Sequence, residues 1–575
     1  MAGQLGAHLI HPRRLLLHST PTQHTDVVLI FPKGLPDSML LWLLQKLRGS
    51  RPRLRVCVRQ HASSGCSAFY ITADDDVLLQ TAEEVHLPKL LKPEFGGGYK
   101  EFTVRDMHCF QKVITWLTYN ILLPACVSRG VVQGMFPLHE RGALENLRRK
   151  WVKTLFAPQP IDEISEYFGV KIAMYFAWLG HYTRSLTVPA VVGFVFWIWL
   201  GTANENWKDI AHVLFSLFNV LWACVYLETW KRYSNALAYK WGTLDQRDEL
   251  LIEPRPLFQG EMSISPVTGR PEPEYPAWKR RLWRHGVSFP VTLLCLIVGT
   301  LVTFTLLHTQ VQNYRLETKY ENHLIVKIAL FQFMNSFMSL FYIAFYLQDM
   351  DKLKEQLAVL LITRQIIGNL KESVLPYLIE NLRLAKICVE VFGALSPTRS
   401  KFILKSTYLK KMHFPGIGQK VIHQAELESQ LFKYEGTFAE YLEMLTQLGH
   451  VVLFSSAFPL AALCAQVNNA AEIRADAFKL CHVAQRPFGE RVNSIGSWQV
   501  RSWLAVLVNC ALIGLSGPVH RLLPDATPAQ TILVIVALEV RSPEIACYRN
   551  SFYQRVKKLF ISNEGKSIKA NQRKK

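Results

Sequence analysis

The sequence predicts a mainly α-helical protein that crosses a membrane several times and carries a small cytosolic α+β domain at its N-terminus. Half of its 575 residues are hydrophobic and only 19% are charged. The apolar residues gather in runs long enough to span a hydrocarbon core of about 30 Å as helices. The net charge of +20 suits either nucleic acid or an anionic membrane surface. Because of the apolar runs, we expect membrane lipids as partners and no nucleic acid.

The first 100 residues have the pattern of a soluble domain. Alternating apolar residues predict strands at 26–31, 54–59 and 67–73, and amphipathic spacing predicts helices at 39–49 and 74–87. Asp37 and Ser38 are suitable caps for the first of these helices. This β-α-β-β-α order predicts a ferredoxin-like domain.

Six segments that contain no Lys, Arg, Asp or Glu are candidate membrane spans: 185–204, 210–227, 287–307, 328–348, 444–471 and 502–520. A globular core rarely contains so many runs of this length. Basic residues near both ends of the loop 230–286 place it in the cytosol by the positive-inside rule. The first 25 residues lack the apolar core of a signal peptide, which also predicts a cytosolic N-terminus.

These patterns divide the chain into four parts. Residues 1–150 form the cytosolic α+β domain and its linker, and residues 151–310 contain the first three spans. Residues 311–540 form a second helical block, which includes a hairpin at 437–485, and residues 541–575 are a basic tail.

Acidic side chains inside or beside spans are functional candidates, because each costs about 2.5–3.5 kcal/mol on insertion scales. Glu440 and Glu443 are three residues apart, and Glu472 and Asp476 are four apart, so each pair shares a helix face. A helical hairpin that turns near Pro459 would return Glu472 to about the depth of Glu443.

A fifth carboxylate, Glu372, follows the apolar stretch 357–370. Crowded carboxylates repel by about 4 kcal/mol per close pair at an effective dielectric constant of 20, so the cluster needs a cation or protons. The amides of Asn369, Asn468 and Asn469 add further oxygen atoms. Hard oxygen ligands in this number favour calcium over zinc or copper.

Two alternatives compete with a calcium site. The acids can lie at interfacial helix ends and pair with Arg474, Lys371 or Lys479. A hydrolase with paired carboxylates is the weaker alternative, because no His or Ser nucleophile is patterned beside the acids. His450 is two helical turns from Glu443 and is expected to be a packed polar group. We therefore predict that the protein is not an enzyme.

Long segments of the sequence resemble the anoctamin family of calcium-activated chloride channels and phospholipid scramblases, in particular its anoctamin-8 branch. The resemblance covers most of residues 130–520 and is carried by segments 166–180, 239–244, 253–260, 322–347, 360–366 and 440–480. It implies a cytosolic ferredoxin-like domain, ten membrane helices and a homodimer in the plasma membrane or endoplasmic reticulum. It also implies calcium-regulated transport of chloride or other ions, or phospholipid scrambling.

The resemblance implies a site for two calcium ions, and its ligands can be carried over residue by residue. They are Glu372 of the sixth helix, Glu440 and Glu443 of the seventh, and Asn468, Glu472 and Asp476 of the eighth. The asparagine ligand of the family's sixth helix falls on Gly368, so Asn369, one residue away, is a weaker candidate ligand.

Two departures from the family pattern affect this expectation. Only residues 308–322 separate the third span from the run that is similar to the family's fifth helix, so the fourth helix, one wall of the transport path, is missing. Segment 529–539 begins like the tenth helix and then changes, which disfavours a homodimer, since the family dimerises largely through this helix. The alternative function is a non-conducting membrane scaffold or a membrane-contact tether.

Overall fold

The computed structural model describes the N-terminal sheet and many of the helices that follow it. It covers residues 25–49, 54–61, 65–84, 88–90, 99–101, 103–104, 130–154, 157–202, 205–243, 260–264, 271–274, 278, 317–347, 349–375, 377–379, 382, 424–454, 457–490, 492 and 494–498. The predicted spans 287–307 and 502–520, the segment 529–539 and the tail 541–575 lie outside the described residues.

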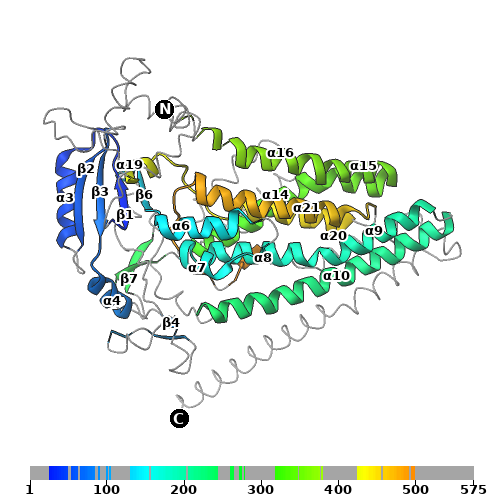
Figure 1. The fold of residues 1–575 in the computed structure, drawn as a ribbon, viewed down its shortest axis with the longest axis horizontal. Helices are drawn as coiled ribbons and strands as arrows, with labels where there is room; N and C mark the ends of the chain where they lie inside the picture. Colours follow the sequence, from blue (N-terminus) through cyan, green and yellow to red (C-terminus); the bar gives the residue numbers. More distant parts are fainter. Residues whose placement is uncertain are drawn as a thin grey trace, which may run out of the picture.

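The N-terminal part forms a four-stranded antiparallel sheet with the strand order β2-β3-β1-β6 (Figure 1). Its strands are β1 (Val27–Ile30), β2 (Arg55–Gln60), β3 (Ser67–Thr72) and β6 (Gly134–Pro137). Helix α3 (Asp37–Gly49) follows β1, and α4 (Asp75–Glu84) follows β3. The predicted β-α-β-β-α succession is therefore present, and β6 completes the sheet beside β1, the strand order of a ferredoxin-like domain. Leu29, Phe69 and Leu43 pack between the sheet and α3.

Two short hairpins complete the strands among the described residues. One pairs β4 (Pro88–Leu90) with β5 (Tyr99–Glu101), and the other pairs β7 (Glu261–Ile264) with β8 (Pro271–Glu274). The second hairpin lies inside the predicted cytosolic loop 230–286.

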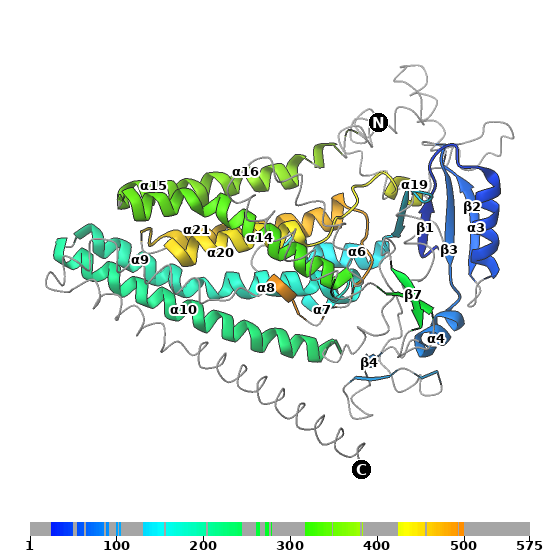
Figure 2. The ribbon, with the colours of Figure 1, turned by 180° about the vertical axis from the view of Figure 1, so that it is seen from behind.

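The remainder is an elongated helical bundle that extends away from the sheet (Figure 2). Its first half contains α6 (Arg141–Leu147), η3 (Arg148–Val152), α7 (Ile161–Phe168), α8 (Val170–Ser185), α9 (Thr187–Thr202) and α10 (Glu205–Lys240). The second half begins with α14 (Glu317–Phe341), η7 (Tyr342–Leu347), α15 (Met350–Val359), η8 (Leu360–Arg364), α16 (Gln365–Asn369) and η9 (Leu370–Val374). It ends with α19 (Gln424–Glu428), α20 (Phe438–Phe454), α21 (Ala461–Phe478), η10 (Lys479–Val483) and η11 (Gly496–Trp498).

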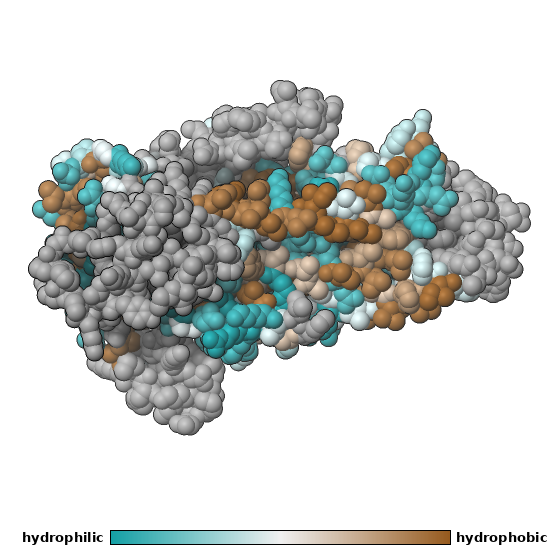
Figure 3. All heavy atoms as spheres, turned by 45° about the horizontal axis from the view of Figure 1, so that its top comes forward, coloured by the Kyte–Doolittle hydropathy of each residue, from teal (hydrophilic) through white to brown (hydrophobic). Residues whose placement is uncertain are grey.

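The bundle is apolar both in its core and on much of its outside. Helix α8 is central, with Phe176 and Tyr182 fully buried. Outward-facing apolar residues include Val191 on α9 and Leu221 on α10, with exposed fractions of 60% and 67%. Figure 3 shows apolar side chains gathered over the helical part of the surface. An exposed apolar surface of this extent is typical of contact with lipid or with a partner.

Four of the predicted spans can be compared with described helices. The runs 185–204, 210–227 and 328–348 fall on α9, α10 and α14 with η7, and 444–471 falls on the hairpin of α20 and α21. Within the described residues, one helical stretch, Tyr320–Ala344, has both the length and the apolarity needed to cross a membrane.

One predicted boundary was wrong. The loop 230–286 was expected to begin at residue 230, but α10 continues to Lys240. Ion pairs support this extension, because Arg232 pairs with Glu228 one helical turn earlier, at 3.5 Å, and Lys240 pairs with Asp162 of α7 at 2.7 Å.

Candidate functional site

Helix α21 is the element around which the candidate site is built. It contacts α8, α9 and α20, and it also contacts η8, α16 and η9 of the predicted sixth helix. The turn before it confirms the predicted hairpin, since α20 ends at Phe454 and α21 begins at Ala461. A Cβ added to Gly193 of α9 would overlap with the carbonyl oxygen of Pro459, so the absence of a side chain there lets α9 approach the turn.

The two acids of α20 lie in its first two turns. Glu440 has an exposed fraction of 4%, and its Oε1 accepts a hydrogen bond from Lys479 Nζ at 2.8 Å. Glu443 reaches the predicted sixth helix, because its Oε1 lies 3.3 Å from the position that a Cβ on Gly368 would occupy. Glycine at position 368 therefore leaves room for the Glu443 carboxylate.

Both acids of α21 are also buried in the bundle. Glu472 and Asp476 have exposed fractions of 2% and 4%. Asp476 Oδ2 accepts a hydrogen bond of 2.7 Å from the Tyr175 hydroxyl of α8. This donor is neutral, so it orients the carboxylate without cancelling its charge.

Amide side chains join α21 to α16. Asn468 Nδ2 donates to Gln365 Oε1 at 2.8 Å, and Asn468 Oδ1 accepts from Asn369 Nδ2 at 3.0 Å. Within the described part of the chain, Asn369 Oδ1 is buried and accepts no hydrogen bond. A buried oxygen without a hydrogen-bond donor lowers the stability of the fold unless a water molecule donates to it or a cation binds it.

Glu372 lies in η9, and η9 contacts α21. Among the side chains that the structure describes, no group of three or more His, Cys, Asp or Glu is close enough to hold a metal ion. The donor set itself fits calcium, because it consists of carboxylate and amide oxygens and includes the uncompleted Asn369 Oδ1. The assignment of the six predicted ligands and of Asn369 to a calcium site therefore stays a prediction. The helices that carry these residues all contact α21 or are α21 itself.

The competing expectation of ion pairing is met at Glu440. Lys479 pairs with Glu440, whereas Arg474 donates to the backbone carbonyls of Trp151 and Ala157 and so joins α21 to the segment before α8. Tyr175 and Gln365 were not among the predicted site residues. They are far from α21 along the chain, and the available signal was their position inside the resembling segments 166–180 and 360–366.

The polar interior continues further along the hairpin. Gln447 of α20 and Asn469 of α21 have exposed fractions of 0%, and no described residue forms a hydrogen bond with either side-chain carboxamide. His450 packs against Phe337 of α14 with ring centroids 4.7 Å apart, which agrees with the expected packed polar role.

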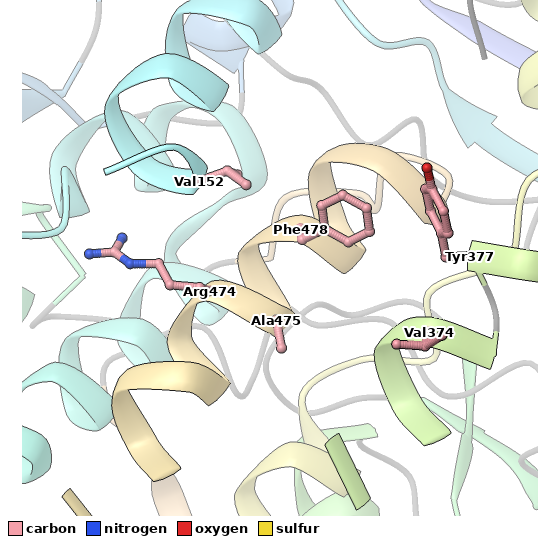
Figure 4. Close-up of a pocket in the computed structure, with 6 residues that line it drawn as sticks. All are labelled: Val152, Val374, Tyr377, Arg474, Ala475 and Phe478. Carbon is pink, nitrogen blue, oxygen red and sulfur yellow. The ribbon is translucent and has the colours of Figure 1, made fainter. Parts of the chain in front are cut away.

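A cavity of about 430 Å³ lies between η9 and α21 (Figure 4). It is lined by Val152, Val374, Tyr377, Arg474, Ala475 and Phe478. Val374 is two residues from Glu372, and Ala475 adjoins Asp476. The cavity therefore separates part of η9 from α21, while at its edge the rings of Tyr377 and Phe478 have centroids 5.4 Å apart.

A buried polar junction connects the sheet to the base of the hairpin. The His139 backbone N–H donates to Glu428 Oε2 at 3.0 Å, and Gln424 Nε2 donates to Glu428 Oε1 at 2.7 Å. Arg486, which follows η10, donates to the Tyr167 carbonyl at 2.8 Å. Burial raises the pKa of Glu428 to about 7 and lowers that of His139 to about 3. The junction thus joins the end of β6 to the segments on both sides of the hairpin.

Comparison with known proteins identifies the family of this chain. The anoctamin family, described as calcium-activated chloride channels, matches residues 164–312 and 304–541. The chain belongs to the anoctamin family. Membership implies an integral membrane protein, and it makes a role of the channel or scramblase type the general expectation.

Relatives of this anoctamin cover most of its sequence. Anoctamin-8 of Mus musculus is 32% identical over 93% of this chain and 76% of its own length. Anoctamin-8 of Homo sapiens is 31% identical over 93% of this chain, which spans 65% of the human protein. Anoctamin-10 of Danio rerio is 37% identical over 72% of this chain and 68% of its own length.

The matches also bear on the predicted absence of the fourth helix. The family match comes in two pieces that overlap at residues 304–312, close to the position at which that helix is predicted to be absent. The alignment with the Mus musculus protein runs over 803 positions, more than the 575 residues of this chain. The relative therefore contains segments that have no counterpart here.

Proposed function

We propose that this anoctamin moves chloride or other ions, or phospholipids, across a membrane under the control of calcium. The observation that carries the proposal is the burial of three carboxylates, Glu440, Glu472 and Asp476, on a hairpin that packs against the predicted sixth helix. Carboxylates buried in a membrane-type bundle are costly and are retained for a function.

The proposed mechanism is electrostatic gating. The five acids, Glu372, Glu440, Glu443, Glu472 and Asp476, contribute about −5 in charge. Their repulsion, about 4 kcal/mol per close pair, opposes closer packing of the sixth-helix segment on α21. Two bound calcium ions would supply +4 and offset this repulsion. The sixth-helix segment then approaches α21 across the cavity at its end and opens the path.

The proposal is tested with the full chain in lipid vesicles. Flux of chloride and of a fluorescent phospholipid is measured with and without calcium, for the wild type and for Glu472→Gln. Loss of one carboxylate should weaken the apparent calcium affinity about 10- to 100-fold, as for other groups that support a metal site. Glu435→Gln is the matched control, because Glu435 is exposed and lies before α20.

Two results would contradict the proposal. One is wild-type flux that does not depend on calcium, and the other is a Glu472→Gln variant whose calcium response equals that of the control. Calcium-dependent thermal stabilisation of the purified protein provides a second readout, since a ligand that binds the folded state raises its stability.

A second candidate function is a non-conducting scaffold or membrane-contact tether. The two-piece family match favours it, because loss of the fourth helix would remove a wall of the transport path. Vesicles of two compositions, incubated with the protein, separate the candidates. Bridging without flux supports the tether, and flux without bridging supports transport.

We further propose a cytosolic N-terminus and a plasma-membrane or endoplasmic-reticulum location. The positive-inside pattern of the loop 230–286 supports the orientation. The changed tenth-helix sequence disfavours the homodimer of the family. An epitope placed before residue 25 that becomes accessible to antibody only after the membrane is permeabilised is the expected result. Surface labelling of intact cells at this epitope contradicts the orientation.

A further inference from the structure

The ion pair between Lys479 and Glu440 lies inside the proposed ligand set. Lys479 is the first residue of η10, directly after α21, and Glu440 is in the first turn of α20. Their Nζ and Oε1 atoms are 2.8 Å apart. The Glu440 side chain is 4% exposed and that of Lys479 is 24% exposed. An ammonium group therefore occupies an oxygen that a calcium ion would need.

We infer that Lys479 is a built-in competitor of calcium for Glu440 and thereby sets the calcium affinity of the site. The inference rests on the proposed function and adds a residue that determines affinity. An ammonium 2.8 Å from Glu440 Oε1 repels a calcium ion that would coordinate the same carboxylate, so the two cations compete for Glu440. With Lys479 in place, the cluster also has one negative charge fewer to attract the ion.

The position of Lys479 allows this competition to be reversible. Its side chain is a flexible four-carbon stem, and about a quarter of it is exposed, so the ammonium can move to water when calcium takes its place. Arg474 of α21 donates to the backbone carbonyls of Trp151 and Ala157, which precede α7, and so joins α21 to that segment. Lys479, by contrast, contacts an acid of the candidate site.

The ion pair also has a role when calcium is absent. A buried carboxylate that loses its charge partner is strongly destabilising. Lys479 therefore stabilises the calcium-free protein by offsetting part of the charge of Glu440. Removal of its ammonium should weaken the calcium-free form and strengthen calcium binding, which is a combination that a purely structural ion pair does not produce.

The experiment uses the full chain in lipid nanodiscs, with direct binding of radioactive calcium and thermal unfolding as readouts. Lys479→Met should bind calcium about 10- to 100-fold more tightly, the range for removing one hydrogen bond to a charged group. Its unfolding temperature without calcium should fall, and saturating calcium should restore it. Lys479→Arg keeps the charge and should retain the weaker binding.

Lys352→Met is the control for the loss of one positive charge. Lys352 pairs with Asp349 at the start of α15. This pair is about 30 Å from η9, measured along the helical segment that runs from α15 to η9. Calcium binding by this variant should equal that of the wild type, since the charge change is the same and the site is untouched.

The possible results separate the inference from the proposed function. If the wild type binds calcium and Lys479→Met binds it no more tightly, the inference is wrong and the calcium site stands. Equal destabilisation of this variant with and without calcium also contradicts the inference. If only the variant binds calcium, Lys479 replaces the ion permanently, so the inference holds and calcium control of the native protein fails. If neither binds calcium, both fail.

Discussion

Replacing Glu428 with glutamine should change how the stability of the protein depends on pH. Glu428 is 4% exposed, accepts hydrogen bonds from the His139 N–H and from Gln424, and has a pKa raised to about 7 by burial. Arg141 and Arg486 face the carboxyl group and act in the opposite direction, but burial outweighs them. Glutamine has nearly the same shape, retains an acceptor oxygen and carries no charge at any pH.

The sign of the effect follows from the two pKa values. An acid whose folded pKa is above its unfolded value of 4.5 binds its proton more tightly in the folded state. Its contribution to stability is complete below pH 4.5 and is lost as the pH rises to about 7. The difference corresponds to about 3 kcal/mol, since one pKa unit is about 1.4 kcal/mol.

His139 contributes with the opposite sign. Burial lowers its pKa from 6.5 to about 3, so the unfolded chain binds a proton in this range that the folded protein excludes. Its effect makes stability rise with pH between these values. Between pH 4.5 and 6.5 the two residues therefore largely cancel in the wild type. Glu428→Gln removes one of them and leaves the rise due to His139.

The assay is the difference in unfolding temperature between Glu428→Gln and the wild type, measured in detergent from pH 5 to pH 8. We expect the difference to increase with pH in favour of the variant and to level off above pH 7. Glu435→Gln, an exposed change of the same kind, should give a flat difference. Parallel profiles for Glu428→Gln and the wild type would refute the assignment of a raised pKa to Glu428.

Two further substitutions test the packing around α21. Tyr175→Phe removes the hydrogen bond to Asp476 and should lower the free energy of unfolding by about 1.5–3 kcal/mol in chemical denaturation; no change would show that the bond is dispensable. Gly193→Ala places a methyl group against the Pro459 carbonyl and should destabilise by about 1–3 kcal/mol. Gly142→Ala, on α6, meets no atom within 4 Å and should be neutral or stabilising by up to about 1 kcal/mol.

Much of the fold could be predicted because its signals are local. Alternation and amphipathic spacing located β1, β3 and α3 to within a few residues, and the proline near position 459 located the turn of the hairpin. The end of α10 was missed for a physical reason. The charged residues that mark a cytosolic flank are also good helix formers, and ion pairs such as Arg232 with Glu228 continue the helix beyond the apolar run.

The candidate site could be predicted only in part. Spacing of three and four residues places acids on one helix face, and the hairpin brings the two helices together. The partners of these acids depend on tertiary packing. Tyr175 reaches Asp476 from a helix 301 residues away, and Gln365 reaches Asn468 across 103 residues. No local pattern indicates such contacts.

The sequence offered two opposed interpretations of the acids, a calcium site or ion pairs with nearby lysine and arginine. The contacts show that the two interpretations are compatible. Lys479 offsets one carboxylate, Glu440, whereas the Asp476 carboxylate is oriented by a neutral hydroxyl, and the carboxylate of Glu443 lies against the glycine at position 368. In the proposed site, the carboxylates other than Glu440 would still attract a calcium ion in a low-dielectric bundle. The inferred role of the lysine pair is therefore to lower calcium affinity, which is consistent with a calcium site.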